Sequence, residues 1–97
     1  MAAVKIRWTQ LAVEDLDSAY DFIAETNPTA ARSVIAKIES ALKALKAHPL
    51  LGRKGRVEDT RELVVPATPS IVAYRIGRRR IEILAVIHGA RRWPERF

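Results

Sequence analysis

The segment "RIEILAVIHG" (residues 80–89) decides the fold, because it carries apolar side chains on both faces of an extended strand. Strict alternation puts Ile81, Ile83, Ala85 and Ile87 on one face, and Leu84 and Val86 on the other. Such a strand is either central in its sheet and covered on both faces, or covered on one face with the other open to a partner.

Three more strands are expected outward from this segment. "TRELVV" (60–65) and "SIVAYRIG" (70–77) are separated by the turn sequence "PATP", and the basic turn "GRRR" (77–80) leads into the last strand. "VKIRW" (4–8) alternates between apolar and basic residues and predicts a first strand with one buried face.

Two amphipathic helices are predicted between the first strand and residue 50. Thr9 can cap the first helix, and Asn27 with Pro28 begins the second, which Pro49 ends. The short linker implies an antiparallel hairpin. The apolar stripes are Leu16, Ala19, Tyr20 and Ile23, followed by Ala31, Val34, Ile35, Ile38, Ala41, Leu42 and Leu45.

These elements predict an α+β fold with the order β-α-α-β-β-β. A two-helix antiparallel hairpin would pack on one face of a small, mostly antiparallel sheet, since this arrangement buries every apolar stripe. The chain has 97 residues, which fits a single domain over 1–97.

Composition excludes several classes of function. The chain has no cysteine, and its two histidines lack metal-ligand spacing, so we expect no metal, no cofactor and no thiol chemistry. No segment reads as a signal sequence or a membrane span, so the sequence predicts a cytoplasmic protein.

The net charge of +6 lies entirely in the second half of the chain. Residues 1–52 hold six basic and six acidic side chains, whereas residues 53–97 hold eleven basic and five acidic ones. This polarity favours an acidic partner. The charge is densest in "GRKGRVEDTREL" (52–63), where Gly52 and Gly55 allow a sharp turn and arginines would follow the sheet edge.

"HPLLGRKGRVEDTREL", "IVAYRI" and "VIHGARRWP" resemble, in this order and spacing, the RelE/ParE family of bacterial toxins, and most closely its ParE branch. The resemblance covers essentially the whole chain. It implies a toxin that forms a hetero-oligomer with a cognate antitoxin, here of the ParD type. ParE-like members inhibit DNA gyrase, whereas RelE-like members cleave messenger RNA in the ribosome, and the shared fold does not choose between them.

An RNA-cleaving site would need cations and a group that transfers protons. His88 is the best proton-transfer candidate, with Tyr74 and Glu62 as lesser ones. The tyrosine-containing endings and the strand lysines of RelE-like nucleases are missing, which favours a binding toxin over an enzyme. The candidate phosphate-holding cations are Arg56, Arg61 and Arg75.

Each candidate also has a structural explanation. His88 could hydrogen-bond to backbone, Tyr74 could fill the core, and Arg61 could pair with a neighbouring acid (Glu58, Asp59 or Glu62). Trp93 could anchor an interface or dock onto its own sheet. The predicted partner-binding residues are Arg56, Arg61, Arg75, His88, Arg91, Arg92 and Trp93. We expect the antitoxin to cover both apolar and basic surface.

Overall fold

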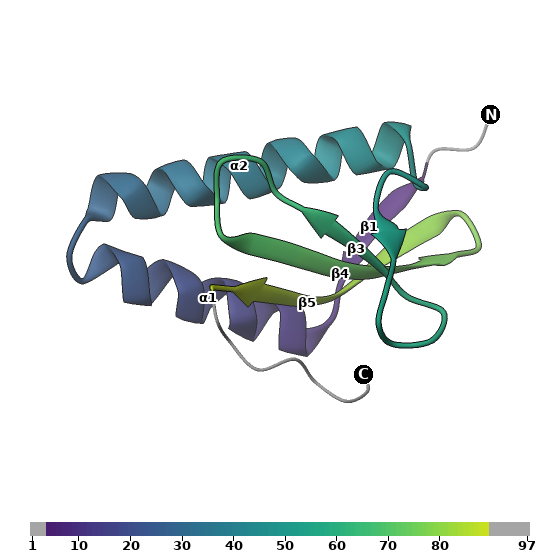
Figure 1. Ribbon diagram of the computed structural model, residues 1–97, viewed down its shortest axis with the longest axis horizontal. Coiled ribbons are helices and arrows are strands. Elements are labelled where there is room, and N and C mark those ends of the chain that lie inside the picture. Colours follow the sequence, from purple (N-terminus) through teal and green to yellow (C-terminus); the bar gives the residue numbers. More distant parts are fainter. Residues whose placement is uncertain (1–3, 90–97) are drawn as a thin grey trace.

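The computed structural model describes residues 4–89, in which two helices lie antiparallel along one face of a five-stranded sheet (Figure 1). The sheet order is β1-β5-β4-β3-β2, with β1 parallel to β5 and every other pair antiparallel. The predicted α+β class and helical hairpin are confirmed. The elements are β1 (Lys5–Trp8), α1 (Gln10–Ala24), α2 (Pro28–Ala47), β2 (Arg53–Lys54), β3 (Arg61–Val64), β4 (Ser70–Gly77) and β5 (Arg80–His88).

The predicted helix starts are confirmed. Thr9 Oγ1 accepts a hydrogen bond from Ala12 N at 3.3 Å and donates one to Ile83 O at 2.8 Å, so the cap also fastens α1 to β5. Asn27 Oδ1 accepts from Ala30 N at 3.0 Å, and Pro28 occupies the first turn of α2. No helix in the described part of the chain is long and apolar enough to span a membrane.

β5 is central in the sheet, between β1 and β4, but its predicted division into two faces is wrong beyond Ile83. Tyr74 pairs with Ile83 and Ala73 with Ala85, which leaves Leu84 as the extra residue of a β-bulge. A bulge shifts the alternation by one residue.

The bulge therefore changes which β5 side chains meet the helices. Val86 joins Ile81 and Ile83 in the main core between sheet and helices, instead of facing away from them. Ala85 and Ile87 join Ala73 in a separate buried cluster on the opposite face. The strand is thus apolar on both faces as predicted, with the two sets exchanged after Leu84.

The predicted hinge contains an unpredicted short strand, β2, which forms one edge of the sheet. Tyr74 holds the preceding segment in place: its hydroxyl donates to Pro49 O at 2.7 Å and accepts from Gly52 N at 2.9 Å. A Cβ on Gly52 would lie 2.7 Å from the Tyr74 ring, so this glycine is required by close packing. Tyr74 is fully buried, which confirms the prediction that it fills the core.

Candidate partner-binding site

A groove runs between α2 and β3, with a volume of about 710 Å³. Small residues of α2, including Ala36, Ser40 and Ala44, form one wall. Apolar residues outside the helix, including Leu51 and Val64, form the other. These two side chains are 51% and 50% exposed, a large fraction for aliphatic residues, so the groove offers apolar surface to a partner. We call it the α2–β3 groove.

The backbone of β3 continues this groove as an open sheet edge. Val65 N donates to Ser70 O, so alternate residues of β3 bond to β4, and Val64 directs its N–H and C=O outward. β2 covers only Arg61 and Glu62, because the chain before it turns away at Leu51. An extended partner segment could therefore add backbone hydrogen bonds at Val64.

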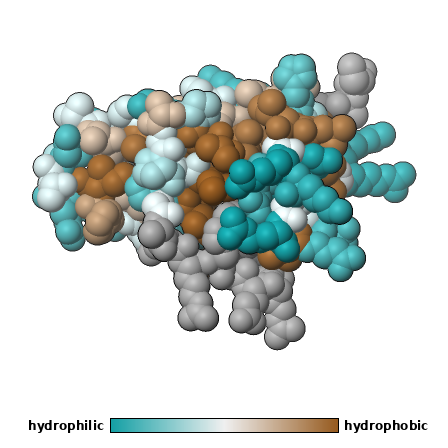
Figure 2. Space-filling model, in the orientation of Figure 1, coloured by the Kyte–Doolittle hydropathy of each residue, from teal (hydrophilic) through white to brown (hydrophobic). Residues whose placement is uncertain are grey.

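Figure 2 shows hydrophobic surface gathered across the middle and upper right of one face, beside a dense group of hydrophilic side chains on the right. The exposed large apolar residues include Leu50 and Leu51 after α2 and Val64 on β3. Apolar and charged surface are thus adjacent, as expected for a site that combines burial with charge.

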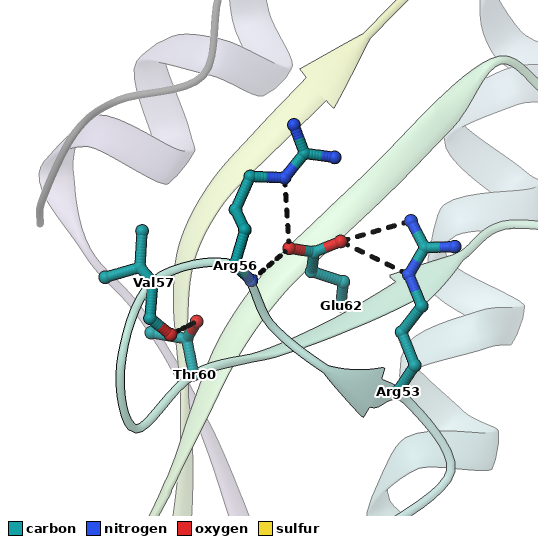
Figure 3. A network of polar contacts seen from close by, with 5 residues as sticks. All are labelled: Arg53, Arg56, Val57, Thr60 and Glu62. Carbon is teal, nitrogen blue, oxygen red and sulfur yellow. Dashed lines mark hydrogen bonds and ion pairs between the residues drawn. The ribbon is translucent and has the colours of Figure 1, made fainter.

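The Glu62 network lies at the charged end of β3 (Figure 3). Glu62 is 3% exposed and accepts hydrogen bonds from Arg53 Nη2 at 3.1 Å and from Arg56 N at 2.8 Å. Arg56 Nε lies 3.4 Å from the same carboxylate. Thr60 Oγ1 closes the loop by donating to Val57 O at 2.6 Å. The network attaches β2 and its loop to β3.

Burial raises the pKa of Glu62, but hydrogen bonds from Arg56 and Arg53, together with their positive charges, outweigh burial and hold the pKa below its ordinary value. Glu62 is therefore an ionised counterion for two arginines, a poor match to the proton-transfer role considered from the sequence. Arg56, a predicted partner-binding residue, is committed to this network through its backbone and its side chain.

The structure separates the remaining candidates into two places. Arg61 and Arg75 line one pocket, together with Lys54. His88 lies at the other end of β4, where its Nδ1 is 2.7 Å from the buried Ser70 Oγ. Because Arg61 pairs with Tyr74 and His88 with Ser70, roughly 13 Å of strand divides them. One ring nitrogen of His88 is thus engaged by a side chain, and the backbone hydrogen bond expected from the sequence stays a prediction.

Arg61 forms none of the ion pairs considered from the sequence. Its Nη1 donates to Gly52 O at 2.7 Å instead, while Glu62 pairs with Arg53 and Arg56. Arg75 Nε lies 3.5 Å from Glu82 Oε1. The predicted contact residues Arg91, Arg92 and Trp93 lie outside the described residues.

Sequence reasoning missed Lys54 and the wall of the groove. It found no strand lysine because it predicted no strand at β2, where Lys54 lies. The signal for the groove was a run of small residues along α2 (Ser33, Ala36, Ser40 and Ala44), which resembles an ordinary solvated helix face. Within residues 4–89, no three His, Cys, Asp or Glu side chains gather as a metal ion would require.

The sequence of this chain is similar to those of known toxins. The family model described as the ParE toxin of the type II toxin-antitoxin system parDE matches residues 6–93. The Y4kP protein of Sinorhizobium fredii is 43% identical over 95 residues, which cover 98% of each chain. Toxin RelE2 of Caulobacter vibrioides is 30% identical over 87 residues, which cover 90% of this chain and 97% of the relative.

A solved structure of the chromosomal ParDE system from P. aeruginosa also matches this fold. It superposes with a TM-score of 0.81 at 26% identity, over 92% of this chain and 99% of the other. This chain therefore belongs to the ParE toxin family of type II toxin-antitoxin systems.

Proposed function

We propose that this protein is a ParE-like toxin that binds and inhibits DNA gyrase and is held inactive by a ParD-like antitoxin. The observation that carries the proposal is the family match over residues 6–93, supported by similarity to the ParDE structure. Residues 1–97 act as one toxin domain. We expect the protein to act in the cytoplasm, where both proposed partners would be found.

The candidate site supports a binding function better than RNA cleavage. Burial raises the pKa of Tyr74 above its ordinary value of 10.0, although the hydrogen bond from Gly52 and the charge of Arg61 oppose the shift. Its hydroxyl is also occupied by Pro49 O and Gly52 N. His88 is distant from the Arg61 pocket along β4, so the described residues do not combine cations with a group ready for proton transfer.

The α2–β3 groove is the proposed seat of the antitoxin. An antitoxin segment would bury aliphatic side chains against Leu51 and Val64 and form backbone hydrogen bonds at the open edge. Lys37 on the groove wall would face a carboxylate of the same segment. Such an occupant would cover both apolar and basic surface, which stays a prediction.

The alternative function is cleavage of messenger RNA in the ribosome. It is supported by the 30% identity with Toxin RelE2 and by Lys54 on β2, a strand lysine whose apparent absence from the sequence counted against a nuclease. Family membership is compatible with either target, since target choice depends on the site and not on the fold.

Induced expression in bacteria separates the two functions. Gyrase inhibition predicts a DNA-damage response and filamentation, and co-expression of the adjacent antitoxin gene should restore growth. Immediate loss of protein synthesis without DNA damage would support messenger-RNA cleavage instead. Absence of toxicity from a well-folded protein would contradict both functions.

A further inference from the structure

Two residue pairs join β2 to β3. One pair brings opposite charges together, and the other brings two positive charges together. Arg53 lies across from Glu62, and Lys54 lies across from Arg61. Because successive side chains of a strand point to opposite faces, the two pairs lie on opposite faces of the sheet. The first pair is an ion pair with a separation of 3.1 Å.

The second pair sets two cations directly opposite each other. Like charges in this position destabilise strand pairing, and a negatively charged group between them would relieve the repulsion. Within residues 4–89 neither Lys54 nor Arg61 forms an ion pair. Arg61 Nη1 donates to Gly52 O, which aligns the guanidinium but leaves its charge unneutralised.

A pocket of about 640 Å³ opens at this pair. Arg75 also borders the pocket, but as the neighbour of Tyr74 it points to the opposite face from the Lys54–Arg61 pair and lies 3.5 Å from Glu82 Oε1. Ile76, which is 42% exposed, adds an apolar wall. The pocket is also lined by Glu58 and Asp59. We call it the cationic pocket.

We propose that the cationic pocket binds an acidic peptide segment of a partner protein, with a carboxylate seated between Lys54 and Arg61. An aliphatic neighbour in that segment would pack on Ile76. Glu58 and Asp59 disfavour the continuous negative charge of a nucleic-acid backbone, whereas a peptide can place one carboxylate between Lys54 and Arg61 and keep uncharged residues beside these two acids. Arginine and carboxylate also form strong charge-assisted hydrogen bonds.

This site is distinct from the α2–β3 groove. Leu63 and Val64 of β3 line the groove, whereas Arg61 of the same strand lines the cationic pocket. The inference does not depend on gyrase being the target, because it rests on the charge pairing of β2 and β3.

The test is a titration of the purified, isotope-labelled protein followed by backbone amide shifts. The probe is the peptide DLDLD, with its uncharged analogue NLNLN and a short DNA duplex as comparisons. We expect DLDLD alone to shift the amides of Lys54, Arg61 and Ile76, with an affinity that falls as salt is added. Equal binding of NLNLN, tighter binding of DNA at these amides, or no shifts there would overturn the proposal.

Variants at Lys54 show whether the contact is direct. Lys54 is exposed, so Lys54→Gln should leave the fold intact while weakening DLDLD binding about tenfold. Lys46→Gln on the exposed surface of α2 is the matched control and should bind as the parent does. Lys54→Glu should in turn favour the peptide KLKLK. Equal DLDLD affinities for the two glutamine variants would refute the proposed seat, whatever the gyrase experiments show.

Discussion

The two ends of β3 lie in different surroundings, although the strand is only four residues long. At Leu63 and Val64 the strand borders an open apolar groove, whereas at Arg61 and Glu62 it lies among charged side chains. At the charged end, Glu62 forms ion pairs with both Arg53 and Arg56, whereas neither Lys54 nor Arg61 forms an ion pair within residues 4–89. At the apolar end, by contrast, the side chain of Val64 stays 50% exposed.

Under the two proposals above, this four-residue strand would contribute to two kinds of recognition. Contacts in the groove depend on burial of apolar area and persist when charge is screened, whereas contacts in the cationic pocket weaken with salt. Antitoxin binding should then fall only in part at high salt. The following predictions test each end separately.

The largest effect is expected at the apolar end. Val64→Glu places a charge in the groove without touching the core, because Val64 is 50% exposed. Antitoxin affinity should fall ~30-fold or more, as at an interface hot spot. The measurement is calorimetric titration with the antitoxin encoded beside the toxin gene.

The control for Val64→Glu is Val13→Glu on α1, a similarly exposed valine that does not line the groove. It should bind the antitoxin as the parent does. If both variants bind normally, the groove is not the antitoxin site.

The next largest effect is expected at Tyr74, whose hydroxyl holds the segment between α2 and β2 in place. Tyr74→Phe removes the hydroxyl that serves both Gly52 N and Pro49 O. The free energy of unfolding should fall by about 1–3 kcal/mol, because buried polar groups lose their partner. Urea unfolding measures this change. Tyr20→Phe on the helical hairpin is the control, and an equal loss there would show that the Tyr74 hydrogen bonds contribute nothing specific.

A smaller effect is expected from the pH dependence of the charged end. The pKa of Glu62 is depressed in the folded state, so its contribution to stability is present above the unfolded value near 4.5 and is lost as pH falls through the folded value. Glu62→Gln should therefore flatten the stability curve in this acid range, as measured by urea unfolding at a series of pH values. Identical slopes for parent and Glu62→Gln would contradict the role of the network.

The smallest effect is expected at His88. His88→Gln keeps similar size but cannot titrate near neutral pH, so killing by a binding toxin should be almost unchanged. Removal of a proton-transfer group would instead cost about 10²–10⁴ in rate. Colony survival after induced expression measures the difference, with Arg61→Glu as the change expected to be more damaging. Loss of killing by a folded His88→Gln variant that binds antitoxin would favour the nuclease.

The sequence predicted the features that depend on neighbouring residues. The capping side chains of Thr9 and Asn27 act on amides three positions away, and the alternation of β5 marks a central strand. It did not predict the bulge at Leu84, because a register shift depends on how β4 pairs with β5 and leaves no local mark.

The candidate site was harder to predict, because its parts come from distant segments. The groove forms only when α2 approaches β3, and its helical wall consists of small residues without a chemical signature. Glu62 pairs with Arg53 and Arg56 because β2 pairs with β3. β2 has only two residues, which is too short for a periodic pattern to predict it. The excess of positive charge in the second half could be read from the sequence, but the sequence did not show which of these cations form ion pairs.

The most direct test of the central claim is a supercoiling assay with purified DNA gyrase and the purified toxin. We predict that the toxin inhibits supercoiling, that the antitoxin restores it, and that messenger RNA in a reconstituted translation reaction stays intact. Unaffected gyrase together with cleaved messenger RNA would contradict the proposed function.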